Sequence, residues 1–378
     1  IARRKRSSSL HVRGMECVLP RRGVTMKFPS FLLMVVAAAL PVVVSGEEPA
    51  QPPKIPRISA DPSAEAVLKL PRKVQPEALH EQLAGLKDGT MDERIGKLKA
   101  KVVGDLVFMQ GGPFMMGDFG PLWSPGGTNY TIEKDNKPAH KVMLTSFSIS
   151  RYKTTYAEYD VYLDATNQPH EERKVLPYRN AFVPAGMTWF QAKNYCQWLG
   201  KQAGVPFDLP TEAQWEYAAR SRGQFFVFGT DNGNLDFGRN IDAYEELKLI
   251  RPLSDNADTR GNHRQVWNYP VGMFPPSPMG LYDLNTDGWE WTGDWYAEDY
   301  YKQSPEVDPL GPSAGVWKVA RSTEIGEGPS GMVNMMRYPK DPNARLEFPS
   351  GRPRLMFDPV AYGVRCAVNL DHPVAKQN

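Results

Sequence analysis

The chain has 378 residues, 41% of them hydrophobic and 11% aromatic, which is enough for a packed core in one large domain or two. Its 34 prolines and nine tryptophans favour a loop-rich architecture over a helix bundle. The formal net charge is +2, but residues 1–46 carry eight Lys/Arg and one Glu, so the remainder of the chain is at −5. Because residues 47–378 carry a net negative charge, they lack the basic surface that attracts nucleic acid, which excludes nucleic acid as an electrostatic partner.

The amino end has the pattern of an export signal. Lys27 precedes an apolar run over 31–44, and Val44-Ser45-Gly46 offers a small-residue cleavage site. We therefore expect residues 1–25 to be untranslated sequence or a leader extension and 26–46 to be a signal peptide. The alternative, a membrane anchor, needs a longer apolar run than this one. We expect a periplasmic protein that does not span the membrane once the signal is cleaved.

The segment after the signal divides into two parts. Residues 47–63 are rich in proline, which predicts a flexible tether. Residues 64–104 have apolar residues at helical spacing among many Lys and Glu, which predicts a helical arm. Gly85 and the pair Gly89-Thr90 divide this arm into two helices, and we expect it to be a solvated packing element without chemistry.

A globular domain is expected over 105–372. Residues 106–118 alternate as a strand, turn at Gly111-Gly112 and continue as a second strand. Residues 143–166 contain a strand and then a helix that begins near Thr155. Residues 225–242 predict a strand and a tight turn, and 243–268 a polar surface loop. Together these segments predict an α+β domain with little regular secondary structure.

Two short helices between 188 and 220 have the clearest start signals. Thr188 with Gln191, and Thr211 with Gln214, are capping boxes. The apolar side chains of the first helix recur on one face, and Gly204 stands where a carboxyl-terminal cap is needed. The second helix directs apolar side chains toward the core, namely Trp215, Ala218 and Ala219.

The second of these helices belongs to a segment, PTEAQWEYAAR at 210–220, that resembles the signature of the formylglycine-generating-enzyme (sulfatase-modifying-factor) family. Other landmarks of that family follow in order: GGPFMMGD at 111–118, KPAHKV at 137–142, PVGMFPPSPMGLYDLNTDGWEW at 270–291 and YGVRCA at 362–367. The resemblance implies the family's C-type-lectin-like fold. Since fold alone does not decide function, the residues of each potential site need separate inspection.

The cysteines indicate a disulfide. Cys17 lies upstream of the expected start, which leaves Cys196 and Cys366, and an even pair in an exported protein predicts one disulfide. Two buried free thiols are the alternative. Members of the resembling family pair the same two positions.

The family's copper chemistry is not expected here. Members that oxidise a substrate cysteine bind Cu(I) through two cysteines shortly before the carboxy-terminal motif, whereas residues 320–340 contain no Cys. Met332, Met335 and Met336 stand in that region, and we interpret them as apolar filler rather than as a thioether copper site. The histidines of the expected mature chain show no ligand spacing for iron: His80, His140, His170, His263 and His372.

Structural calcium is the cofactor that the sequence favours. Asp283 and Glu290 bracket a turn whose carbonyls, at Thr286 and Gly288, suit a hard cation, and the resemblance places a calcium ion at the matching positions. Residues 286–288 depart from the family's usual Gly-Asn-Val. The alternative is that Glu290 only caps a buried turn. A second family calcium site is half matched, by Asn240 and Ile241.

A cluster of aromatic residues suggests a partner-binding surface. Trp295, Tyr296, Tyr300 and Tyr301 lie close together in the chain beside acidic residues. Tyrosine is enriched at interfaces because it combines a large apolar ring with a polar tip. The alternative is that half of these side chains belong to the core.

These observations favour a non-catalytic periplasmic binding protein. The segments MMGDFGPL, SISRYKTTYAEYDVY and LPTEAQWEYAARSRGQFFVFGTDNGN look like those of exported family members associated with type VI secretion phospholipase effectors. This resemblance implies an immunity protein that binds and neutralises such a secreted phospholipase. The alternatives are a periplasmic oxidase or maturation enzyme of the family's siderophore-oxidising kind, and a carbohydrate-binding or structural module.

Overall fold

The computed structural model describes residues 76–170, 179–236, 239–241, 270–286, 288–322, 331–344, 346–347 and 360–375, with the side chains of 346–347 and 360–361 left out. All described residues belong to one compact unit. The expected leader, signal peptide, tether and surface loop at 243–268 therefore lie outside the described residues. None of the described helices has the length and apolar character needed to cross a membrane.

The expected helical arm consists of α2 (Glu77–Gly85) and α3 (Met91–Gly104), and the second begins at a capping box on Thr90. As expected of a solvated packing element, much of this arm is exposed, but one face of each helix is buried. Leu83 and Leu98 are buried in the same apolar cluster as the helices that follow. Lys101 is also buried, and its ammonium lies 2.8 Å from carboxylate oxygens of both Glu158 and Asp105. The arm therefore packs as part of the core.

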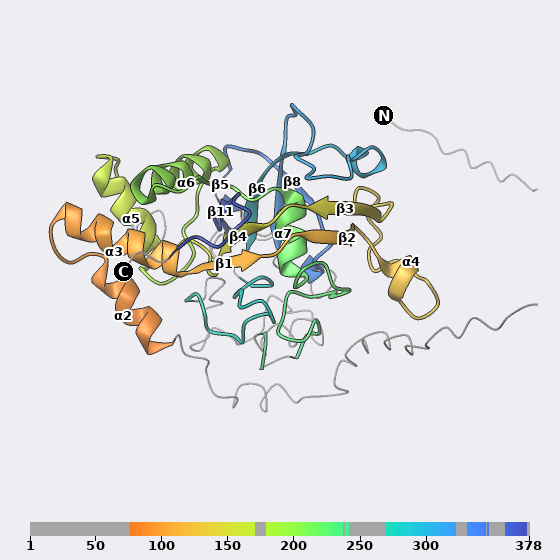
Figure 1. Cartoon of the computed structure of the whole chain (residues 1–378), viewed down its shortest axis with the longest axis horizontal. Coiled ribbons are helices and arrows are strands. Elements are labelled where there is room, and N and C mark those ends of the chain that lie inside the picture. The colour runs from red at the N-terminus through yellow and green to blue at the C-terminus, as the bar shows by residue number, and fades with distance from the viewer. Residues whose placement is uncertain are drawn as a thin grey trace, which may run out of the picture. The chain divides into compact units, whose positions relative to one another are not determined.

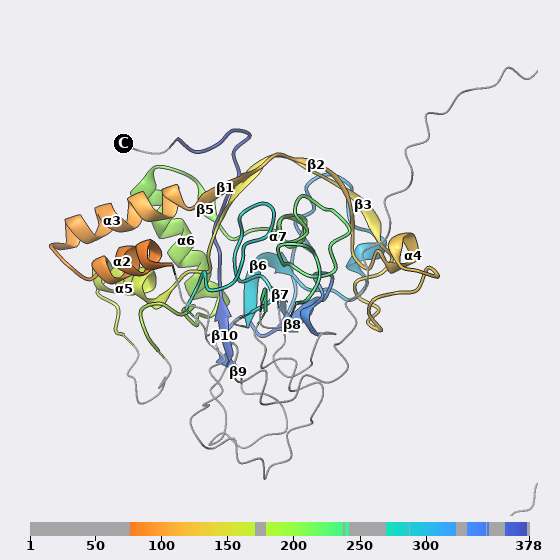
Figure 2. The same ribbon diagram turned by 90° about the horizontal axis from the view of Figure 1, so that it is seen from below.

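The strands of the described residues form three small sheets (Figures 1 and 2). A four-stranded sheet has the order β1-β4-β11-β5, a five-stranded sheet the order β8-β7-β6-β10-β9, and β2 pairs with β3. All pairings are antiparallel except that of β10 with β6. The strand bounds are β1 Leu106–Met109, β2 Gly112–Met116, β3 His140–Leu144, β4 Phe147–Ser150, β5 Phe207–Asp208, β6 Trp289–Trp295, β7 Lys318–Ser322, β8 Tyr338–Lys340, β9 Leu346–Glu347, β10 Val360–Gly363 and β11 Ala367–Val368.

The helices occupy two places. In Figure 1, α2 and α3 gather at one end of the described part with α5 (Tyr156–Ala165) and α6 (Trp189–Ala203), and these helices contact one another. By contrast, α7 (Glu212–Ala219) lies among the strands and packs against β2, β3, β6 and β7. Two shorter elements are α4 (Gly120–Trp123) and the 3-10 helix η1 (Tyr300–Lys302).

Short sequence signals correctly predicted where these helices begin and end. Thr155, Thr188 and Thr211 each accept a hydrogen bond from the backbone N–H three residues on, in complete capping boxes. Gly204 ends α6 with a left-handed φ of +68°, which glycine adopts without a steric penalty. The strand expected within 225–242 is wrong, since the described residues there form turns. The apolar side chains of Val227 and others instead fill a cluster beside α4.

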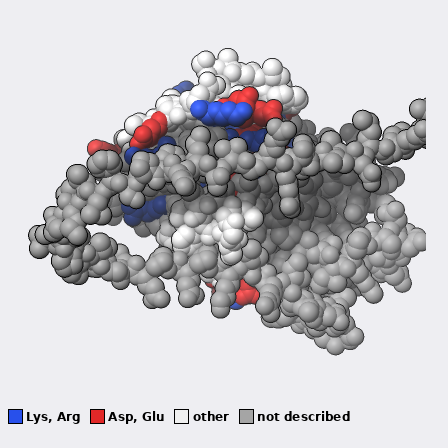
Figure 3. All heavy atoms as spheres, turned by 90° about the vertical axis from the view of Figure 1, so that its right-hand side faces the viewer, with Lys and Arg blue, Asp and Glu red and all other residues white. Residues whose placement is uncertain are grey.

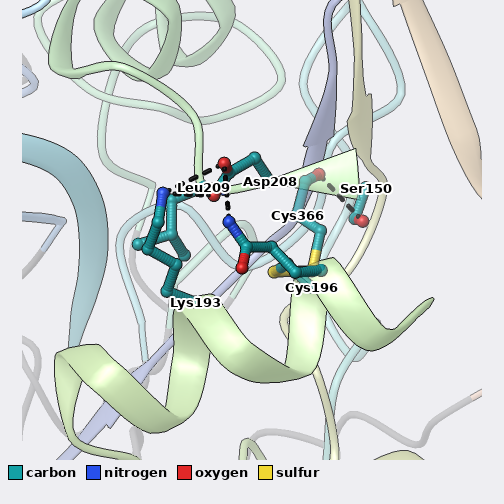
Figure 4. Close-up of a disulfide and its surroundings, with 7 residues drawn as sticks. Ser150, Lys193, Cys196, Asp208, Leu209 and Cys366 are labelled. Atoms are coloured by element: carbon teal, nitrogen blue, oxygen red, sulfur yellow. Dashed lines mark hydrogen bonds and ion pairs between the residues drawn. A yellow bond between two sulfur atoms is a disulfide. The ribbon is translucent and has the colours of Figure 1, made fainter. Parts of the chain in front are cut away.

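The predicted disulfide between Cys196 and Cys366 is present and links α6 to the residue before β11 (Figure 4). Both cysteines are buried. Beside them, Lys193 of α6 bridges to the Asp208 carboxylate of β5, with Nζ 2.9 Å from Oδ1. The covalent link and this ion pair together join the helical end of the molecule to the four-stranded sheet.

Candidate functional site

The two carboxylates of the signature helix α7 are buried counter-ions. Glu212 contacts the guanidinium groups of Arg321 and Arg337, each at 2.7 Å. Glu216 contacts Arg220 at 2.8 Å and Arg321 at 2.7 Å. Although burial acts in the opposite direction, Arg337 and Arg321 hold the pKa of Glu212 below its ordinary value. These charges hold α7 against β7 and are paired within the protein rather than available to a substrate.

A third carboxylate, Asp294 of β6, adjoins this network. Its Oδ2 accepts a hydrogen bond of 2.7 Å from the backbone N–H of Glu212, at the first turn of α7. Burial and the nearby negative charge of Glu212 raise the pKa of Asp294 to about 7. The group therefore gains or loses a proton near neutral pH within the core, which makes it a determinant of stability.

The first predicted calcium ligands do come together. Glu290 and the carbonyl oxygens of Thr286 and Gly288 converge on one point; we call these three groups the oxygen cluster. The group at that point is the ammonium of Lys153, which donates to the carbonyl of Thr286 and, at 3.2 Å, to that of Gly288. Its Nζ also lies 3.7 Å from Glu290 Oε1.

Glu290 has further partners. Arg365, from the YGVRCA motif, binds both of its carboxylate oxygens, at 2.7 and 2.9 Å, and Trp215 Nε1 donates to Oε2 at 2.9 Å. Against the effect of burial, Arg365 and Lys153 hold the pKa of Glu290 below its ordinary value. The residues present therefore do not fit a calcium ion at the oxygen cluster, because two protein cations already neutralise its carboxylate.

Asp283, the fourth predicted ligand, is buried next to the oxygen cluster. Its Oδ2 accepts a 2.8 Å hydrogen bond from the backbone N–H of Gly272. Burial raises its pKa to about 6 despite that hydrogen bond.

The half-matched second site is also occupied by protein groups. Asn240 accepts a hydrogen bond from the Asp236 N–H at 2.7 Å and donates to Asp231 at 2.9 Å. Arg239 pairs with both of these aspartates. Ile241 is buried in the apolar cluster beside α4. The other half of the site falls in 255–268, outside the described residues.

Within 320–340, where members of the family have their copper cysteines, residues 323–330 lie outside the described residues and the methionines lie in an apolar cluster. Met332 and Met335 are buried in the cluster with Phe119 and Phe228, which agrees with their interpretation as filler. Within the ranges that the structure describes, no three His, Cys, Asp or Glu side chains are grouped so as to hold a metal ion.

The predicted aromatic surface requires a correction. Tyr300 and Tyr301 are buried, and the Tyr301 hydroxyl donates to Glu212 at 3.1 Å, because η1 turns both rings toward α7. Trp295 and Tyr296 remain partly exposed. Trp295 stacks on Trp189 at 6.3 Å between ring centroids.

Exposed large apolar side chains that the sequence did not reveal occur in segments next to this tryptophan pair. We call Phe190, Leu310, Val316 and Trp317 the apolar patch; Phe190 is 47% and Trp317 46% exposed. The Phe190 ring meets Trp189 at 5.3 Å, and the Tyr296 N–H donates to the carbonyl of Trp317 at 2.8 Å.

Between the two tryptophans lies a lysine. The Lys318 ammonium sits 3.9 Å from the ring centroid of Trp189 and 3.7 Å from that of Trp295. Burial lowers its pKa to about 8. This cation–π sandwich makes the base of the apolar patch rigid.

Charges on another face are mixed. Figure 3 shows basic and acidic side chains next to one another among the residues described there. Exposed pairs of opposite sign, such as Lys141 with Glu306, occur along the edge of β3.

Sequence reasoning missed the buried cations. Lys153 precedes the α5 capping box by two residues, and Arg321 and Arg337 stand in or beside strands, so nothing local distinguishes them from surface residues. Arg365 lay in a recognised motif, yet its role as partner of Glu290 depends on residues 75 positions apart in the chain.

An α+β fold with short strands and a lectin-like scarcity of regular structure is that of the formylglycine-generating enzymes, and the comparisons agree. Residues 92–370 match the model of the sulfatase-modifying factor enzyme 1-like domain. The chain belongs to this family.

Relatives and structures show how far the similarity extends. The chain is 31% identical over 292 residues to "Serine/threonine-protein kinase pkn1" of Chlamydia pneumoniae. The aligned part covers 71% of this chain but only 39% of that protein. It is 26% identical over 270 residues to the formylglycine-generating enzyme of Streptomyces coelicolor, and the alignment covers 57% of this chain and 76% of that enzyme. The solved structure of PvdO from Pseudomonas aeruginosa has a TM-score of 0.50 at 23% identity, covering 70% and 94%, and supports the fold.

Proposed function

We propose that this protein is a non-catalytic periplasmic binding protein, and specifically an immunity protein that neutralises a secreted phospholipase of type VI secretion. One observation supports the first part most: Cys196 and Cys366 are joined in a disulfide, and residues 320–340, where the copper-binding pair would stand, contain no Cys. The family also contains a relative named "Inactive C-alpha-formylglycine-generating enzyme 2" of Bos taurus, 37% identical over 118 residues.

The buried carboxylates support the same conclusion. A general acid or base must reach its substrate, but Glu212, Glu216 and Glu290 are buried and paired with arginines. A hollow among the described residues, next to Lys101 and Tyr195, has a volume of about 10 Å³, which is room for one water molecule. These features fit a stable scaffold that presents a surface.

The apolar patch is the surface that we assign to the partner. Phe190 and Trp317 are large, about half exposed and held by a rigid base, as interface anchors are. The mouth of a phospholipase is apolar because its substrate is a lipid. Seating the patch over that mouth would bury apolar surface on both proteins and block access to the lipid, so inhibition would be steric.

A periplasmic pull-down with matched variants tests this proposal. The chain should recover a phospholipase at 1:1 stoichiometry, and the double variant Phe190→Ala/Trp317→Ala should lose it. Ile132→Ala is the control, since Ile132 is 95% exposed and is not part of the apolar patch. We expect the control to retain full binding and the melting temperatures of all three proteins to agree within about 2 °C, as for surface substitutions.

Two results would contradict the proposal. Retention of the phospholipase by the double variant would remove the apolar patch from the interface. Recovery of no protein partner, together with copper or iron in the purified protein, would favour the alternative of a periplasmic oxidase or maturation enzyme.

A further inference from the structure

We infer that the oxygen cluster of Thr286, Gly288 and Glu290 is a cation site whose cation is the Lys153 ammonium of the same chain, so that the site binds no divalent metal until that side chain is removed. The inference goes beyond the proposed function and does not depend on it. The observation that carries it is the position of Nζ, which contacts both carbonyls and lies 3.7 Å from the carboxylate.

The chemistry of the cluster selects a cation. Two backbone carbonyls and a carboxylate present only acceptor oxygens, and all of them are withdrawn from water; Glu290 and Lys153 have no exposed surface. Without a positive charge between them, these oxygens would repel one another and their lost hydration would not be replaced. Either a metal ion or an ammonium group can meet this demand.

The Lys153 side chain is held in this place by its backbone. The N–H of Thr154 donates to Val364 at 2.8 Å, and the N–H of Ala185 donates to the carbonyl of Thr154 at 2.9 Å. Thr155 then begins α5 with its capping box. The Lys153 stem passes Gly363 so closely that a Cβ there would lie 3.7 Å from Cδ. The ammonium is therefore fixed in the oxygen cluster by the fold.

The local charges argue against a metal in addition to the lysine. Arg365 already binds both oxygens of Glu290, with Nε 2.7 Å from Oε2. A divalent ion would have to displace the ammonium, and the displaced charge would then be buried without a partner. Since an amine cannot be removed by a chelator, the fold would not depend on calcium around the protein.

Comparing the effect of calcium on two lysine variants tests the inference. Lys153→Ala removes the ammonium and leaves the oxygens. Lys318→Ala is the matched control, because it also removes a buried ammonium but one that lies between two tryptophan rings. The melting temperature of the full chain and of each variant is measured in EDTA and in 1 mM calcium chloride.

We expect Lys153→Ala to melt below the unaltered chain in EDTA and to regain about 5 °C or more in calcium, because a ligand that binds only the folded state stabilises it. The unaltered chain and Lys318→Ala should differ by less than about 1 °C between the two buffers. An equal calcium effect on the unaltered chain and on Lys153→Ala, whether large or absent, would overturn the inference.

A measurement on the unaltered chain decides the case if Lys153→Ala does not fold. Trp215 donates directly to Glu290, so a terbium ion in the oxygen cluster would be excited by that ring. We expect no saturable terbium luminescence from this tryptophan. Luminescence that calcium displaces and that Trp215→Phe abolishes would show a metal in the cluster and overturn the inference.

Discussion

The buried ion pairs beneath the signature helix should contribute far more to stability than an exposed pair of the same geometry. Glu216 contacts Arg321 at 2.7 Å, and neither side chain is exposed. It also contacts Arg220 at 2.8 Å and accepts a hydrogen bond from the Gly117 N–H at 2.9 Å. Glu216→Gln keeps the shape of the side chain and removes its charge, so two guanidinium groups lose the same counter-ion.

The expected cost follows from burial. Removing one partner of a buried pair costs about 3–5 kcal/mol. Here the Arg220 guanidinium is left without its carboxylate in a medium of low polarity, while Arg321 keeps Glu212. At roughly 2–4 °C per kcal/mol for a domain of this size class, the melting temperature should fall by about 6–20 °C. Urea unfolding followed by tryptophan fluorescence would give the free energy directly.

The exposed pair of Lys141 and Glu306 provides the matched control. Its ammonium and carboxylate are also 2.7 Å apart, but the side chains are 59% and 54% exposed. Glu306→Gln should cost no more than about 1 kcal/mol, because water already solvates both charges. The reasoning is refuted if Glu216→Gln costs as little as Glu306→Gln.

Two further predictions concern the core. Because burial raises the pKa of Asp294 to about 7, the folded state keeps a proton that the unfolded chain releases near pH 4, so stability falls as pH rises between these values. Asp294→Asn should reduce that fall by up to about 1.4 kcal/mol per pH unit, and urea unfolding at pH 5 and pH 8 that gives equal pH dependence for both proteins would contradict this. The disulfide joins residues 170 positions apart, so Cys196→Ser/Cys366→Ser should lose about 2–5 kcal/mol of unfolding free energy. A double variant with an unchanged urea midpoint would count against a stabilising role.

Much of the local structure could be predicted because its causes are local. The capping boxes at Thr155, Thr188 and Thr211 involve groups three residues apart, and all three are present. The same holds for Gly204, whose lack of a side chain suits the left-handed end of α6. Ordered motifs at fixed positions were sufficient to predict the family and its α+β fold.

The predictions that failed depended on long-range packing. Tyr300 and Tyr301 follow one another in a polar stretch, and packing with residues distant in the chain, such as Glu212 and His140 around Tyr301, buries them. The arm helices carry enough charge to suggest exposure. One face of these helices is buried because α3 contacts α5 and α6, and there the Lys101 ammonium pairs with the Glu158 carboxylate.

The sequence by itself determined the helix starts, the family, the disulfide partners and the oxygens that could surround a cation, since these follow from residue identity and short spacing. The tertiary structure decided which cation lies among those oxygens. Lys153 and Thr286 are 133 positions apart, and no periodicity or motif connects them. Their contact arises because long-range pairing of the strands brings the β4–α5 connection against the turn before β6.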